Sequence, residues 1–287
     1  MIQIESLGIV GYGFVGEAVY AGFEDQFNVE VYDTDPEKVT CNSLLELAKL
    51  TNIFFICVPT PMNKDGSCNT SIVESIVKNL DMIANNREED PQFIAVIKST
   101  IPPGTTERLN KEISRVTCVF NPEFLTEAAS VSDFLNQNRI IIGGPRPAST
   151  VVRTIYNKAF PNVHTIKTSS TVAELVKYMT NTFLATKVAF ANEFYQVCEA
   201  LDEDYDKVLE YFLYDDRIGN THLNVPGPDM HFGFGGSCFV KDLNAFKMVA
   251  KKLNIDTPVI DGAWEKNLEV RPERDWEKLV GRAVTKE

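Results

Sequence analysis

The chain has 287 residues, of which 44% are apolar, and a formal net charge of −12 at pH 7. This size and apolar content allow a substantial core and about two domains. The negative charge argues against a nucleic-acid partner, because phosphate backbones are bound by faces rich in Lys and Arg. The longest unbroken apolar run, residues 53–58, is far shorter than the roughly 18 to 20 residues of a membrane helix, and the N-terminus lacks a secretory pattern. We therefore expect a cytoplasmic protein without a membrane or nucleic-acid partner.

The cysteines show no pattern of a metal site. They stand at positions 41, 57, 68, 118, 198 and 238, without a CxxC pair or a zinc-like Cys/His spacing. Cys57 and Cys118 lie inside apolar runs and are interpreted as small core residues. Reduced thiols agree with a cytosolic location.

Strand-like and helical stretches alternate along the first half of the chain. Helical spacing continues from the first strand over residues 13–23, and strand-like apolar runs occupy residues 6–10, 29–33, 52–59, 93–100, 116–120 and 139–144. Continuous apolar strands that alternate with helices are typical of a parallel sheet covered on both faces. The predicted fold class is α/β.

A stretch without Gly or Pro covers residues 168–201 and predicts one long helix. Thr171 followed by Glu174 fits a capping box at its start. At 1.5 Å per residue this helix would span on the order of 45 Å, and its apolar residues lie on more than one side. We expect a domain boundary near residue 170, an all-helical second domain over residues 171–287, and a homodimer across the long helix.

A glycine motif follows the first strand. Gly11 permits a tight turn, Gly13 lets the backbone approach a pyrophosphate, and Gly16 allows close packing between helix and strand. Asp33 ends the next strand, where a carboxylate accepts hydrogen bonds from a ribose 2′-hydroxyl and repels a 2′-phosphate, and Lys38 can reach the adenosine end. The pattern predicts a Rossmann-type domain that binds NAD over residues 1–170. The alternative is that the glycines only form turns and Asp33 only caps a helix.

A second glycine-rich segment, GFGGSCFVKD, covers residues 233–242. Glycines let the backbone pass close to a ligand, which would place Cys238 for reaction. Lys241 and a helix that starts near Lys241 and Asp242 would both favour the thiolate form of Cys238. A glycine-rich turn with a buried structural cysteine is the alternative.

Taken together, several segments resemble the UDP-glucose/GDP-mannose dehydrogenase family, and most closely its UDP-glucose 6-dehydrogenase branch. They are GIVGYGFVG, CVPTP, KSTIPPGTT, NPEFLTEA, RIIIGG, AELVKYMTNTFLATKVAFANE, RIG and GFGGSCFVKD, in this order. The resemblance covers nearly the whole chain. It implies a four-electron oxidation of a nucleotide sugar from primary alcohol to carboxylate, which consumes two NAD⁺ and water. Cys238 matches the family nucleophile, which carries a thiohemiacetal and then a thioester.

The resemblance also assigns the other catalytic positions. Lys177 and Asn181, four residues apart on one helix face, match the lysine and asparagine that hold the reacting oxygen. Read alone, they are an exposed lysine and a surface asparagine. Asp242 matches an aspartate that orients water or the lysine, and Thr100 matches a hydroxyl near the nicotinamide.

Two glutamates match acids of the hydrolysis step. Glu127 corresponds to the candidate general base, and Glu123 to a second acid near it. If both crowd one pocket, repulsion or desolvation should raise the pKa of one of them.

The resemblance extends to the binding residues. For NAD they are Gly11, Tyr12, Gly13, Phe14, Val15, Gly16, Asp33, Lys38, Val58, Pro59, Thr60, Ser99, Thr100 and Lys241. For the nucleotide sugar they are Phe124, Leu125, Lys177, Asn181, Arg217, Asn224, Phe234 and Gly235. Arg217 matches an arginine that reaches a neighbouring subunit's substrate, and a salt bridge to Asp215 or Asp216 is the equal alternative.

The chain departs from the family pattern at two points. Val240 stands where relatives usually have a proline, and the chain ends at Glu287, where relatives continue into another nucleotide-binding domain. We expect a short form that lacks this domain. Three functions stay open: a two-step oxidation of UDP-glucose through Cys238, a single-step dehydrogenase of another nucleotide sugar or a 3-hydroxy acid, and a non-catalytic NAD-binding dimeric scaffold.

Overall fold

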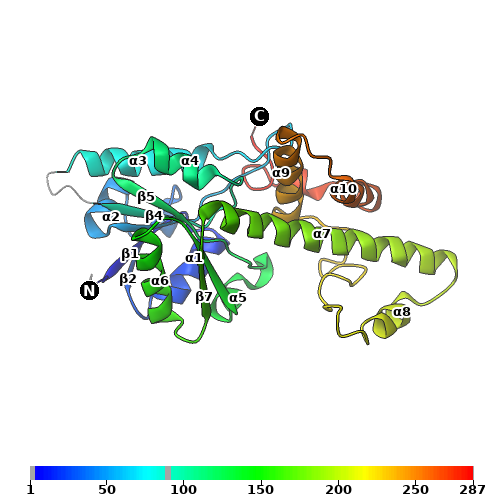
Figure 1. Cartoon of the computed structure of the whole chain (residues 1–287). Coiled ribbons are helices and arrows are strands. Elements are labelled where there is room, and N and C mark those ends of the chain that lie inside the picture. Colours follow the sequence, from blue (N-terminus) through cyan, green and yellow to red (C-terminus); the bar gives the residue numbers. More distant parts are fainter. Residues whose placement is uncertain (1–3, 88–91, 287) are drawn as a thin grey trace. The chain divides into compact units, whose positions relative to one another are not determined.

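A seven-stranded sheet organises the first part of the chain (Figure 1). The computed structural model describes residues 4–87 and 92–286. The strands follow the order β2-β1-β3-β4-β5-β6-β7. Their bounds are β1 (Ser6–Val10), β2 (Asn28–Tyr32), β3 (Ile53–Ile56), β4 (Phe93–Ile97), β5 (Val116–Phe120), β6 (Arg139–Gly143) and β7 (His164–Thr168).

The sheet is parallel except at one place. The six strands expected from apolar runs are all present, and every neighbouring pair is parallel except β5 and β6, which pair antiparallel at Phe120 and Gly143. The expectation of a wholly parallel sheet is therefore wrong at this pair. The edge strand β7 was not predicted, because none of its five residues is fully buried and the apolar run that marks the other strands is missing.

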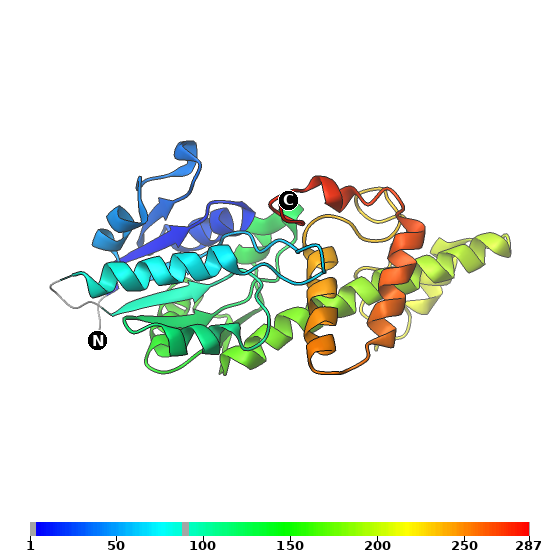
Figure 2. The same cartoon turned by 90° about the horizontal axis from the view of Figure 1, so that it is seen from above.

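Helices cover both faces of the sheet, as the nearly continuous burial of the inner strands requires. Along β3, Phe55 packs into one core and Phe54 into the other. The first face carries α1 (Phe14–Phe23), α5 (Ser130–Leu135) and α6 (Ala148–Ala159). The second carries α2 (Leu44–Leu50), α3 (Ser71–Asn85) and α4 (Thr105–Glu112), and Figure 2 shows α3 lying over the strands. The short 3₁₀ turns are η1 (Pro36–Lys38) and η2 (Glu127–Ala129).

The long helix predicted from the Gly- and Pro-free stretch is α7 (Ser170–Ala200), with 31 residues. It would be about 45 Å long at the usual rise. Within the described residues, no helix, α7 included, is both long and apolar enough to cross a membrane.

The start of α7 differs from the predicted capping box. Thr171 lies inside the helix, and the Ser169 hydroxyl oxygen accepts the first-turn bond instead, at 3.3 Å from the backbone nitrogen of Val172. Glu174 is fully buried and serves another helix. Its carboxylate accepts bonds from the backbone nitrogens of Gly104 (2.6 Å) and Thr106 (2.9 Å). Glu174, which the sequence pattern assigns to the start of α7, therefore caps the N-terminus of α4.

The chain divides into two compact units. The first holds the described residues up to Thr60 and residues 70–177, and the second holds residues 61–69 and the described residues from Tyr178 onward. The second unit contains the rest of α7, α8 (Tyr205–Phe212), α9 (Cys238–Lys252), α10 (Pro258–Val270) and the 3₁₀ turn η3 (Asp275–Lys278). The Rossmann-type α/β fold followed by a helical part is confirmed, whereas the extents 1–170 and 171–287 stay a prediction.

Aromatic side chains form the core of the second unit. Phe234, Trp264 and Trp276 pack together there, and α9 and α10 form a helical hairpin (Figure 2). The segment 61–69 joins this unit through backbone bonds, since Met62 donates to Ala283 at 2.8 Å and accepts from Thr285 at 2.9 Å.

Candidate active site

The loop between β1 and α1 has the geometry of a phosphate cradle. Gly11 has φ +93°, and a Cβ at Gly16 would lie 2.0 Å from the Gly11 carbonyl oxygen, so both positions require glycine. A Cβ at Gly13 would meet no protein atom within 4 Å. Tyr12 lies in this loop, and Phe14 and Val15 begin α1, whose N-cap makes no side-chain hydrogen bond. The loop therefore offers free space at a helix N-terminus, which suits a pyrophosphate.

Asp33 lies beside this loop, directly after β2. Its carboxylate accepts bonds from the backbone nitrogens of Tyr12 (2.6 Å) and Asp35 (2.8 Å). Burial alone would raise the pKa of Asp33, but these two bonds lower it below its ordinary value. The carboxylate is an anionic acceptor, as a ribose hydroxyl requires. Lys38, in η1, pairs with Asp35 at 3.7 Å.

The next two parallel strands end at the same edge of the sheet. Val58 and Pro59 follow β3, and the Ser99 hydroxyl after β4 donates to the Val58 carbonyl at 2.7 Å. Thr60 and Thr100 are buried. These residues fit NAD at the carboxyl ends of the strands, where nucleotides bind in such sheets.

A buried ion pair lies after β5. Lys177 on α7 donates to the backbone oxygen of Glu123 at 2.7 Å and to its carboxylate at 2.9 Å, and neither side chain exceeds 7% exposure. The other carboxylate oxygen accepts from the Leu125 nitrogen at 2.7 Å. The Phe124 ring lies 5.6 Å from the Lys177 ammonium. Lys177 is therefore not the exposed lysine of the alternative interpretation.

The electrostatics of Glu123 differ from the expectation for two crowded acids. Burial alone would raise the pKa of Glu123, but Lys177, the Leu125 nitrogen and Lys98 lower it below its ordinary value. Glu127 is the exposed first residue of η2. The expected rise in pKa is thus wrong for Glu123, because a lysine and not a second carboxylate sits against it.

Sequence reasoning missed Lys98, which is 2% exposed. Its ammonium donates to Asn121 at 3.0 Å and to the Tyr156 hydroxyl at 3.3 Å, and it lies 5.4 Å from the Phe134 ring. Burial lowers the pKa of Lys98 to about 8. The signal was a charged residue directly after the apolar run of β4 and before Ser99.

Cys238 is the first residue of α9, three residues earlier than the predicted start near Lys241. The thiol therefore projects from the N-terminus of the helix itself, where the dipole favours a negative charge. Lys241 and Asp242 follow at spacings of three and four, on the same helix face. By contrast, burial raises the pKa of the core thiols Cys57 and Cys118 to about 12, as expected of core residues.

A polar cluster surrounds Cys238 in the second unit. Asp242 is 1% exposed, accepts from the Asn181 amide at 2.6 Å and forms an ion pair with Lys241. Burial alone would lower the pKa of Lys241, but Asp242, Cys238 and Cys68 raise it above its ordinary value. Lys241 thus stays cationic beside the thiol. The sequence predicts roles for Lys241 both at the Cys238 thiolate and at the cofactor, and both stay predictions.

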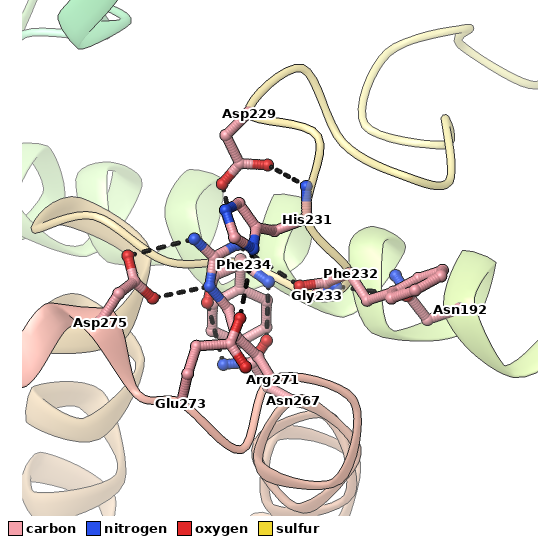
Figure 3. A network of polar contacts seen from close by, with 10 residues as sticks. All are labelled: Asn192, Asp229, His231, Phe232, Gly233, Phe234, Asn267, Arg271, Glu273 and Asp275. Atoms are coloured by element: carbon pink, nitrogen blue, oxygen red, sulfur yellow. Dashed lines mark hydrogen bonds and ion pairs between the residues drawn. The ribbon is translucent and has the colours of Figure 1, made fainter.

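The predicted substrate residues lie in different settings. Arg217 forms the exposed salt bridge to Asp215 that was its alternative interpretation, and Asn224 is exposed. The Phe234 ring is buried in the core of its unit, and Gly235 lies against the Arg271 guanidinium. Figure 3 shows the polar network around Gly233, Phe234 and Arg271.

Comparison with known proteins decides the family. Residues 40–160 match the NAD binding domain of the UDP-glucose/GDP-mannose dehydrogenase family, and residues 171–269 match its central domain. The chain belongs to this family. The match to the NAD binding domain confirms NAD as the cofactor.

Relatives in this dehydrogenase family include UDP-glucose 6-dehydrogenases of two Rickettsia species. The R. bellii protein is 35% identical over 82% of this chain and 53% of its own length, and the R. typhi protein is 31% identical over 93% and 67%. The solved UDP-glucose dehydrogenase of Pyrobaculum islandicum superposes with a TM-score of 0.84 at 28% identity, over 93% of this chain and 68% of that one. The chain spans about half to two thirds of the length of these relatives.

Proposed function

We propose that the protein oxidises a nucleotide sugar, UDP-glucose first, at C6 from the alcohol to the carboxylate, with NAD⁺ and through Cys238. The observation that carries the proposal is the position of Cys238 at the N-terminus of α9, on one helix face with the partly buried Lys241. A thiolate is a strong nucleophile towards a carbonyl and a good leaving group from a thioester. Family membership supports this assignment.

The reaction runs in two oxidations and a hydrolysis. The alcohol becomes an aldehyde, the Cys238 sulfur adds to its carbon, and the resulting thiohemiacetal is oxidised to a thioester. Water then attacks the thioester carbon, releases the carboxylate and restores the thiol. Bound NAD⁺ accepts the hydride in each oxidation. One alcohol, two NAD⁺ and one water give one carboxylate, two NADH and three protons.

We assign the remaining roles by contact and charge. Two of the three Lys177 ammonium hydrogens are directed to Glu123, and the third stabilises the reacting oxygen together with Asn181. Asp242 fixes the Asn181 amide and keeps Lys241 charged. Glu127 serves as base for the attacking water, and Thr100 lies near the nicotinamide.

A homodimer through α7 is part of the proposal. One face of this helix exposes large apolar side chains at spacings of three, four and seven, which are Met179, Phe183, Phe190, Phe194, Val197 and Leu201. Phe183 and Met179 are 62% and 74% exposed, and the rings of Phe190 and Phe194 lie 4.7 Å apart. A continuous apolar stripe of this kind is typical of a protein interface. A second copy of the chain covers it, and the reduced thiols suit a cytoplasmic dimer.

The test is product stoichiometry over a panel of UDP- and GDP-sugars with NAD⁺. We expect two NADH per UDP-glucose from the wild type and no carboxylate from Cys238→Ser. One NADH per sugar, with full activity in Cys238→Ser, would instead establish a single-step dehydrogenase. NAD binding without oxidation of any sugar would establish the scaffold.

A further inference from the structure

Side chains of α7 and α10, and Arg271 directly after α10, contact the glycine segment that precedes Cys238, and Figure 3 shows the contacts at Gly233 and Phe234. We propose that Arg271 is a positioning residue for Cys238, acting through the glycine segment 233–236. This inference rests on the proposed function, in which Cys238 is the nucleophile.

Side chains form hydrogen bonds with the first two residues of the segment. The Gly233 nitrogen donates to Asn192 on α7 at 3.2 Å. The Phe234 backbone makes two hydrogen bonds with the Asn267 side chain on α10. Its nitrogen donates at 2.7 Å and its carbonyl oxygen accepts at 3.0 Å. These contacts hold the main chain at Gly233 and Phe234, four residues before Cys238.

Arg271 contacts the same segment and is itself bound by two carboxylates. It is 3% exposed and forms a two-pronged pair with Asp275, at 2.7 Å from Nε and 3.1 Å from Nη2. Its Nη1 donates to Asp229 at 2.8 Å. The two carboxylates therefore hold the guanidinium in one orientation, as a planar fork allows and an ammonium does not.

The guanidinium lies directly against Gly235. A Cβ built there would be 2.4 Å from Nη2 and 2.5 Å from Cζ of Arg271, so any side chain would displace either the loop or the arginine. Gly235 is glycine because of this contact. Arg271 thus supports Gly235, and α9 begins three residues later at Cys238.

The position of the Cys238 sulfur should determine the reaction rate. Displacing a reacting group by about 1 Å can cost on the order of 100-fold in rate. Because Arg271 is separated from Cys238 by the glycine segment, its loss should move the sulfur and leave the cofactor loop of the other unit as it is. We therefore expect a fall in kcat with little change in the KM for NAD⁺.

The first measurement is the alkylation of Cys238 by iodoacetamide, followed by peptide mass spectrometry over pH 6 to 10. It needs no turnover, so its result stands even if no sugar is oxidised. In Arg271→Lys we expect the alkylation rate and its pH profile to shift, and kcat to fall by roughly 10- to 100-fold. The control is Arg274→Lys, since Arg274 is half-exposed and pairs only loosely with Glu277, at 3.7 Å.

A double-mutant cycle tests the contact itself. Gly235→Ala should reproduce the defect, and adding it to Arg271→Ala should cost little more, because the clash partner is then gone. If Arg271→Lys does not fold, Asp229→Asn is measured in its place. This variant removes one carboxylate partner of Arg271 and keeps the ion pair between Arg271 and Asp275. Unchanged alkylation of Cys238 in a folded variant, or fully additive effects of Gly235→Ala and Arg271→Ala, would overturn the proposal.

Discussion

Lys177 and Glu123 form a buried ion pair, and removing either partner alone should destabilise the protein. Both side chains are almost fully buried, and both carboxylate oxygens of Glu123 are bonded. Removing the lysine would leave an uncompensated buried charge, which is strongly destabilising, whereas an apolar or neutral pair often is not.

We therefore expect Lys177→Met to lower the free energy of unfolding by about 3 to 5 kcal/mol. The double variant Lys177→Met/Glu123→Gln should regain most of this loss without regaining activity. Urea unfolding at pH 7 measures both. A double variant less stable than Lys177→Met would show that the pair does not dominate the site.

Lys98 gives the protein a dependence of stability on pH. Its pKa is lowered to about 8 in the folded protein and returns to about 10.4 in the unfolded chain. Between these values the unfolded state binds more protons, so the free energy of unfolding rises with pH. Relative to Lys98→Met, the wild type should gain on the order of 2 kcal/mol from pH 8 to pH 10. A pH-independent difference between the two proteins would contradict the lowered pKa.

At this scale, the sequence predicted the candidate reacting groups and missed several buried residues that contact them or their neighbours. Cys238, Lys241 and Asp242 stand in one short motif, so their spacing was readable. Lys98, Asn267 and Arg271 act through contacts between residues far apart in the chain, which no local pattern reveals. Arg271, for example, meets a glycine 36 positions before it.

Among the elements, α4 depends on an acid from another helix. The Glu174 carboxylate accepts from two backbone nitrogens and from the Thr106 hydroxyl, at 2.6 Å, at the start of α4. Loss of a helix cap typically costs 0.5 to 2 kcal/mol.

Glu174→Ala should therefore destabilise the protein by about 1 to 2 kcal/mol and speed amide exchange in the first turn of α4. The matched control, Glu107→Ala, removes an exposed acid of the same turn that pairs with Lys111. Hydrogen exchange read by mass spectrometry separates the two. Equal protection of α4 in both variants would refute the cap.

The exposed stripe of α7 makes the second prediction at this scale. Phe190→Glu should convert the dimer to a monomer, because a charge in an apolar interface is costly. Leu253→Glu, a similar change at a 63% exposed residue on α9's end, should leave the dimer intact. Sedimentation velocity gives the mass. Sedimentation of the wild type as a monomer would show that α7 is not a dimer interface.

Element by element, apolar runs and Gly and Pro spacing were sufficient for six strands and the long helix. They were insufficient where tertiary context decides. The edge strand β7 lacks a buried apolar run, and the antiparallel pairing of β5 with β6 leaves no mark on either strand. The helix α9 begins at Cys238, three residues before the predicted start.

For the whole molecule, the central proposal is that the Cys238 thiol captures the aldehyde made by the first oxidation and carries it through the second. The first unit contains the glycine loop with Asp33, and the second contains the helix-terminal Cys238 with Lys241. The chain covers about half to two thirds of the length of its relatives, so the chemistry is tested on this chain itself.

Acid quenching of a Glu127→Gln variant with UDP-glucose and NAD⁺ tests this claim most directly, because slowed hydrolysis should let the thioester accumulate. Peptide mass spectrometry should find the sugar-nucleotide acyl group on the peptide that contains Cys238, and none in Cys238→Ser. No adduct on that peptide, together with one NADH per sugar oxidised, would contradict the account.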